Sequence, residues 1–106
     1  QIWYLDLFAG KNDHEAVQRA GESGHKEINR TNLSTDQITE DLKKDVVQKQ
    51  LALIRMRNTH KAFSEGAEVT ISGGERSLEI RWEYNSAFAT LYVNFESGTY
   101  TIVESR

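Results

Sequence analysis

The residues that could do chemistry in this chain of 106 residues are scattered, and their spacing argues against most kinds of active site. The three histidines, His14, His25 and His60, stand alone, and none has a partner three or four residues away that would place two metal ligands on one helix face. The glycines do not form the GxGxxG pattern of a dinucleotide-binding loop. No two carboxylates form a pair that could be assigned as acid and nucleophile. The sequence therefore predicts no metal site and no cofactor.

A few residues near the start of the chain could contact a ligand. Asp6 lies inside an apolar run over residues 2–8, where a carboxylate is either paired, faces a polar cavity or sits at a strand end in water. Lys11 and Asp13 follow this run and are either ligand contacts or solvated loop residues. Aromatic side chains could stack on sugar rings or fill the core, and they include Trp3, Tyr4, Trp82 and Tyr92.

The first third of the chain resembles part of an α/β fold. Residues 2–8 form an almost continuous apolar run, which is typical of a strand covered on both faces, and an ordinary edge strand is the alternative. Residues 9–33 form a long connection with a short helix expected over residues 14–20. Loops of this length are uncommon unless they are functional or disordered. In (β/α)8 barrels, loops that follow the carboxyl ends of strands build the active site.

Residues 34–63 contain the longest helical pattern, with apolar residues at spacings of three and four. Ser34 and Gln37 form a capping-box start. Asp45 can start a new turn as an N-cap, so the pattern also fits two helices with a joint near residues 43–45.

From residue 67 the apolar period changes to two. Strands are expected over residues 68–71, 78–83, 88–95 and 99–103, separated by turns rich in Gly, Ser and Asn. This pattern predicts a four-stranded antiparallel β meander.

Composition excludes several functional classes. The net charge of −3 argues against a nucleic-acid partner, and no apolar run is long enough for a membrane span. The chain has no cysteine, which suits the cytoplasm. It begins with Gln1 and runs directly into the apolar segment, so we expect it to be a piece of a longer protein.

Several segments, read together, resemble the C-terminal end of the sucrose phosphorylase group within the α-amylase-type glycoside hydrolases of family 13. They are YLDLFAGKND at residues 4–13, EINR at residues 27–30 and IRMRNTH at residues 54–60. The resemblance implies an α+β chain: the last βα unit of a (β/α)8 barrel over residues 1–63, made of a strand, an active-site loop and closing helices. A small four-stranded antiparallel domain follows over residues 67–106.

The resemblance also implies a function for the parent enzyme. Members of the group transfer a glucosyl unit from an α-glucoside to phosphate by a retaining double displacement, with phosphate as co-substrate and no cofactor. Their catalytic carboxylates lie on earlier barrel strands, so this chain alone is expected to hold no catalytic residue and to be inactive. Arg30 matches the arginine that contacts the glucosyl hydroxyls, and Asn29 and Asp13 are weaker substrate-binding candidates. A loop-bridging arginine is the alternative for Arg30.

Three departures from the group's pattern bear on the donor sugar and on the last helix. The segment before residues 28–30 reads Gly24-His25-Lys26-Glu27 rather than ending in Gly-Arg-Asp, Thr31 replaces a histidine, and Asp45 replaces a proline. The first two departures fall where the acceptor or phosphate side would be and count against sucrose as the donor, with sucrose 6'-phosphate and glucosylglycerate as the alternatives. A non-catalytic carbohydrate-binding or assembly module is the alternative function, supported if Trp82 and Tyr92 are exposed on one face of the sheet. An unpaired strand over residues 2–8 would also invite a homodimer.

Overall fold

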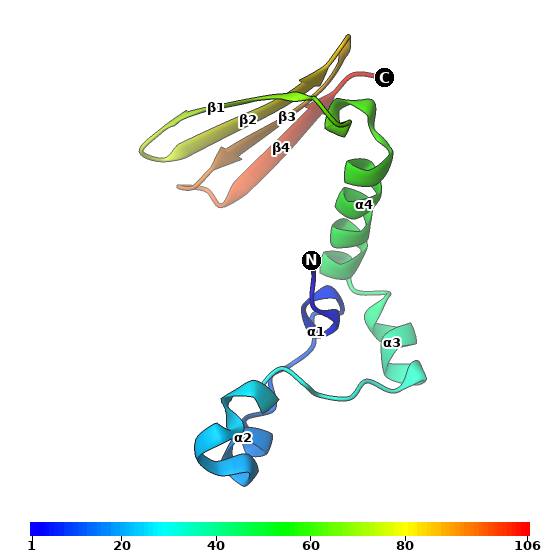
Figure 1. The fold of residues 1–106 in the computed structure, drawn as a ribbon, viewed down its shortest axis with the longest axis vertical. Helices are drawn as coiled ribbons and strands as arrows, with labels where there is room; N and C mark the ends of the chain where they lie inside the picture. Colours follow the sequence, from blue (N-terminus) through cyan, green and yellow to red (C-terminus); the bar gives the residue numbers. More distant parts are fainter. The chain divides into compact units, whose positions relative to one another are not determined.

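The computed structural model describes all residues, 1–106, and its internal contacts divide the chain into two units. The first unit, Gln1–Ile54, is helical, and the second, Arg55–Arg106, contains a four-stranded sheet (Figure 1). No helix is long and apolar enough to cross a membrane.

The first element is a helix where the apolar run predicted a strand. Residues Tyr4–Leu7 form α1, in which the Leu7 N–H donates to Trp3 O and the Phe8 N–H donates to Tyr4 O. Leu5 is 1 % exposed, whereas Asp6 next to it faces solvent. The strand prediction over residues 2–8 is wrong because a short apolar run fits a strand and a buried helical turn equally well, and the backbone here satisfies its hydrogen bonds locally.

Two expectations depended on that strand. Residues 2–8 present no strand edge, so the predicted homodimer through this segment has no strand to pair. For Asp6, the solvated alternative is correct, although it lies in a helix rather than at a strand end.

The long connection carries two short helical segments. Helix α2 covers His14–Ala20, the range predicted from the sequence, and a 3-10 helix, η1, covers Gly21–Glu27. A Cβ atom on Gly24 would lie 2.5 Å from Val17 O, so the close packing of η1 on α2 requires glycine at this position. The connection is therefore a compact loop with two packed helical segments.

The predicted helical region is two helices, α3 over Thr35–Asp41 and α4 over Asp45–Thr59. The joint lies where the sequence placed it, but Asp45 is the first residue of α4 and not its N-cap. Ser34 accepts a hydrogen bond from the Gln37 N–H, as a cap should. The reciprocal half of the capping box is replaced, because the Gln37 amide donates to Asp41 Oδ1 instead. The side chains that pack α4 within the first unit include Val47, which is fully buried.

The second unit is the predicted meander. A short 3-10 helix, η2 (Lys61–Phe63), precedes strands β1 (Glu68–Gly74), β2 (Ser77–Tyr84), β3 (Ala87–Asn94) and β4 (Thr99–Glu104). The strands pair antiparallel in the order β1-β2-β3-β4 (Figure 1). The turn between β2 and β3 holds Asn85 at φ 54°, a conformation that asparagine tolerates well.

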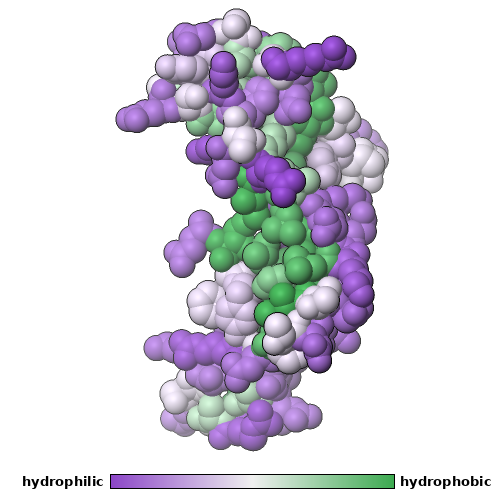
Figure 2. Space-filling model, turned by 90° about the vertical axis from the view of Figure 1, so that its right-hand side faces the viewer, coloured by the Kyte–Doolittle hydropathy of each residue, from purple (hydrophilic) through white to green (hydrophobic).

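The small core of this unit lies at one end of the sheet. Ala62 of η2 and Ala89 of β3 are buried, and the Phe63 and Trp82 rings meet at 5.2 Å. Elsewhere the apolar face is open, and Ile71 is 67 % exposed. The helical unit also has exposed apolar side chains, which include Ile2 and Val46. Figure 2 shows apolar residues in green on one face of the molecule.

Candidate functional site

The site predicted from the sequence is the long loop, residues 9–33, and the structure holds both ends of this loop firmly. It leaves α1 through Ala9, whose φ is 48°, and Gly10, whose N–H donates to Leu5 O at 2.8 Å. A Cβ atom on Gly10 would lie 2.3 Å from Leu5 Cδ1. Because Leu5 is itself buried, only glycine lets the chain turn this tightly into the loop.

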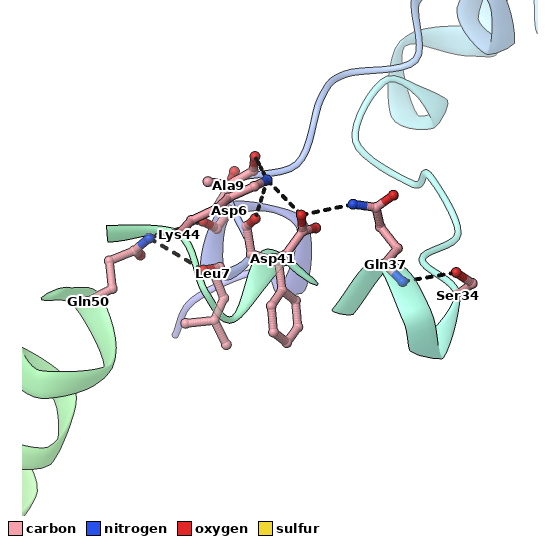
Figure 3. Close-up of polar contacts among 9 residues, drawn as sticks. Asp6, Leu7, Ala9, Ser34, Gln37, Asp41, Lys44 and Gln50 are labelled. Carbon is pink, nitrogen blue, oxygen red and sulfur yellow. Dashed lines mark hydrogen bonds and ion pairs between the residues drawn. The ribbon is translucent and has the colours of Figure 1, made fainter. Parts of the chain in front are cut away.

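Lys44, in the joint before α4, and Gln50, within α4, hold the carbonyls at the end of α1 (Figure 3). Lys44 Nζ donates to Phe8 O at 3.2 Å and to Ala9 O at 3.1 Å. The Gln50 side-chain amide donates to Asp6 O at 3.3 Å and to Leu7 O at 3.4 Å. The last carbonyls of a helix lack partners within it, and a cation there also suits the helix dipole. The joint between α3 and α4 thereby fixes the start of the long loop.

Asp41 is the buried charge that orients Lys44. Its side chain is 3 % exposed and accepts from Lys44 Nζ at 2.8 Å and from the Gln37 amide at 2.9 Å (Figure 3). The hydrogen bond from Lys44 lowers the pKa of the Asp41 carboxyl below its ordinary value of 3.8, helped by Gln37 and opposed by burial. Asp41 is therefore ionised at neutral pH and holds the lysine in place.

The two arms of the long loop are joined by hydrogen bonds. The Asp13 N–H donates to Ile28 O at 2.7 Å, and Thr31 Oγ1 donates to Lys11 O at 3.3 Å. The helical segment between the arms, made of α2 and η1, is therefore closed at its base.

The three predicted substrate contacts lie at this base but do different things. Asp13 caps α2 by accepting from the Ala16 N–H at 2.9 Å, and it pairs with Arg19 at 3.6 Å. Asn29 is exposed and contributes its backbone carbonyl to a hydrogen bond from Trp3 Nε1. Arg30 pairs with Glu27 at 3.2 Å and leaves 53 % of its side chain exposed. Arg30 and Asn29 therefore expose their side chains, whereas the Asp13 carboxylate is engaged within α2.

A pocket of about 500 Å³ opens beside the loop base. Its polar lining comes from both arms and from α3, and it includes Lys11, Thr31, Gln37, Asp41 and Lys44. Asp41 and Lys44 are already engaged with each other, so their charges are largely neutralised within the pocket wall.

Other candidates from the sequence form no site. No group of three or more His, Asp and Glu side chains is placed to hold a metal ion. His60 has a structural role, because its Nδ1 accepts from the Ala62 N–H and its Nε2 lies 2.9 Å from Ser105 O. Trp82 pairs in register with Ala89, and Tyr92 pairs with Glu79. Tyr92 lies three residues from Ala89 along β3, so Trp82 and Tyr92 are on opposite faces of the sheet and form no common stacking platform.

Sequence reasoning missed the residues that hold the loop. Asp41 and Lys44, three residues apart across a helix joint, carry the sequence signal of an ion pair. Nothing in the sequence shows that Lys44 and Gln50 reach the carbonyls of residues 6–9, because such contacts depend on tertiary packing.

Comparisons with known proteins agree with the resemblance read from the sequence. No protein-family model matches the chain. It is 47 % identical over 102 residues to a sucrose 6(F)-phosphate phosphorylase of Ilumatobacter coccineus, a match that covers 96 % of this chain and 19 % of that protein. It is 34 % identical over 109 residues to a glucosylglycerol phosphorylase of Marinobacter adhaerens, covering 99 % of this chain and 22 % of that protein.

A solved structure shows the same fold. The crystal structure of sucrose 6F-phosphate phosphorylase from Thermoanaerobacter thermosaccharolyticum matches with a TM-score of 0.89 and 34 % identity, over 100 % of this chain and 21 % of that one. The chain thus spans about a fifth of the length of its relatives, and the match falls on their C-terminal part. The chain is a homologue of the C-terminal part of the sucrose phosphorylase family.

Proposed function

We propose that this chain is the C-terminal part of a phosphorylase that transfers a glucosyl unit from an α-glucoside to inorganic phosphate. The observation that carries the proposal is the 47 % identity to a sucrose 6(F)-phosphate phosphorylase over nearly the whole chain. In this reaction the glycosidic bond breaks, the glucosyl carbon bonds to an oxygen of phosphate, which is the acceptor, and the alcohol of the donor leaves after its oxygen takes up a proton. The parent is an enzyme of carbohydrate metabolism that needs phosphate as co-substrate and no cofactor.

Within the parent, residues 1–63 close the end of a (β/α)8 catalytic barrel, and residues 67–106 form a small C-terminal domain. The long loop supports this placement because it is fixed at its base and presents Arg30 with an exposed guanidinium. A guanidinium is planar and carries five donors, which suits recognition of sugar hydroxyls. Arg30 is the substrate-binding residue, and Asn29 and Asp13 are the secondary candidates. The absence of cysteine suits an enzyme of the reducing cytoplasm.

The donor is an α-glucoside of the sucrose type, and sucrose 6F-phosphate is the first to test because two of the named relatives are phosphorylases of that compound. The protein in full length is incubated with phosphate and each of sucrose, sucrose 6F-phosphate, glucosylglycerol and glucosylglycerate. We expect glucose 1-phosphate from at least one donor, and none when phosphate is omitted.

The 106-residue chain alone is the matched control, and we expect it to release nothing because it lacks the catalytic carboxylates. A full-length protein that is folded but inactive on all four donors would overturn the proposal. Glucose 1-phosphate made by the short chain would overturn it equally.

A further inference from the structure

The carbonyls of the two residues that flank Arg30 are held by two aromatic side chains from the beginning of the chain. Trp3 Nε1 donates to Asn29 O at 2.7 Å, and the Tyr4 hydroxyl donates to Thr31 O at 2.8 Å. Asn29 immediately precedes Arg30, and Thr31 immediately follows it. The carbonyls of both neighbours of Arg30 are therefore fixed by donors more than twenty residues away in sequence.

A third hydrogen bond fixes Arg30 itself. Its backbone N–H donates to Glu27 O at 3.2 Å, which continues the turn at the end of η1. With the backbone held at three points, the direction in which the Arg30 side chain leaves the chain is set. The guanidinium is less constrained than the backbone, because its one ion pair is with Glu27, whose side chain is 42 % exposed. Exposed pairs of this kind contribute little, so the head group can exchange this partner for a ligand.

The two aromatic donors come from a rigid base. The Trp3 and Tyr4 rings contact each other, with centroids 5.1 Å apart. Leu5, the next residue, is fully buried, and the carbonyls at the end of α1 are held by Lys44 and Gln50. Aromatic side chains have few rotatable bonds, so they transmit the position of α1 to the loop at low entropic cost.

We propose that Tyr4 and Trp3 are positioning residues for Arg30: they hold the carbonyls of the residues on both sides of this arginine so that its guanidinium reaches the donor sugar in a productive orientation. The inference rests on the proposed function, because it assigns a role to Arg30 in donor binding. Small errors in the placement of a substrate-binding group reduce rates strongly, by roughly a hundredfold for 1 Å in demanding cases.

The test uses Tyr4→Phe in the full-length protein, since this change removes one oxygen and keeps the ring. We expect kcat/KM for the donor to fall roughly three- to tenfold, the equivalent of one hydrogen bond, with an unchanged Tm. Tyr100→Phe is the matched control, because Tyr100 is half-exposed on the sheet and lies outside the loop. It should leave kcat/KM unchanged.

A double-mutant cycle with Arg30→Ala separates positioning from a general structural effect. If Tyr4 acts through Arg30, Tyr4→Phe has no further effect on kcat/KM in the Arg30→Ala background. An equal loss in both backgrounds, or no loss in either, would overturn the proposal. Trp3→Phe, which removes the indole donor, is the second variant and should give the same non-additivity.

Hydrogen exchange provides a readout that does not require activity. Amides of residues 28–31 should exchange faster in Tyr4→Phe than in the parent or in Tyr100→Phe. If the full-length protein releases no glucose 1-phosphate, the proposed function fails, and the exchange experiment still decides whether Tyr4 holds the backbone beside Arg30. Unchanged exchange of these amides in both Tyr4→Phe and Trp3→Phe would contradict the positioning role directly.

Discussion

Asp41 shows how one buried carboxylate makes a loop anchor depend on pH. Its pKa is lowered in the folded state, chiefly by the hydrogen bond from Lys44. Asp41 therefore contributes stability that is fully present above its ordinary pKa of 3.8 and is lost as the pH falls from there through the lower, folded value. At neutral pH the contribution is complete.

This direction of the pH dependence leads to a prediction for Asp41→Asn, because the asparagine amide is uncharged like the protonated acid. The variant should unfold more easily than the parent at pH 7, and the difference should shrink as the pH falls below 3.8. Thermal unfolding followed by helical circular dichroism across this range measures it. A difference that stays constant with pH would show that Asp41 is not held ionised by Lys44. The exposed Asp36→Asn, in the first turn of α3, serves as the control.

His60 links two segments of the sheet unit, η2 and the end of the chain, by hydrogen bonds. Its ring accepts from the Ala62 N–H and bonds to Ser105 O, which joins η2 to the end of the chain. His60→Ala should cost about 2 kcal/mol of unfolding free energy, the sum of two ordinary hydrogen bonds.

Urea unfolding of residues 55–106, followed by the fluorescence of Trp82, measures this cost. Asn58→Ala, at an exposed position of α4, is the matched control and should change the free energy by less than about 0.5 kcal/mol. Equal effects of the two substitutions would show that the His60 hydrogen bonds do not support the unit.

At the scale of elements, the joint between α3 and α4 determines where the long loop begins. Lys44→Met keeps most of the side-chain length and removes the donor to Phe8 O and Ala9 O. It also leaves Asp41 without its cation, so the effect should exceed that of an ordinary surface lysine. We expect hydrogen exchange to accelerate over residues 9–13, and Lys43→Met, whose pair with Glu40 is exposed, to leave it unchanged. Exchange that is the same in both variants would contradict the anchoring role.

Elements with a clear period could be predicted from the sequence, whereas the first element could not. The strands alternate in polarity, and α2 and the joint at Asp45 carry local signals for turns and caps, so these predictions agree with the structure. Residues 2–8 have no period, because nearly all of them are apolar, and they fold as α1. The residues that anchor the loop could not be predicted either. Tyr4, Lys44 and Gln50 donate to backbone carbonyls, and every residue has a carbonyl, so the sequence does not show which ones they reach.

At the scale of the whole molecule, the chain comprises two contact units. The sheet unit has its own small core around Ala62, Ala89 and Trp82, and its strands pair only with one another. Residues 55–106 should therefore fold without the rest of the chain, although with low stability because so much of the apolar face is open.

Circular dichroism and urea titration of residues 55–106 check this prediction. A strand-type spectrum and a cooperative transition are expected, and both should be lost in Trp82→Ala, which removes the ring that packs against Phe63. A spectrum of a disordered chain for the unsubstituted fragment would show that the sheet needs residues 1–54.

The way in which the long loop is held also bears on which substitutions it tolerates. Its anchors grip main-chain oxygens at residues 6–9, 29 and 31, which every amino acid possesses. Side chains along the loop can therefore be replaced by mutation while the path of the backbone is inherited intact. A loop that is held in this way tolerates substitutions at exposed positions such as Asn29, because the hydrogen bond there uses the backbone carbonyl and not the side chain.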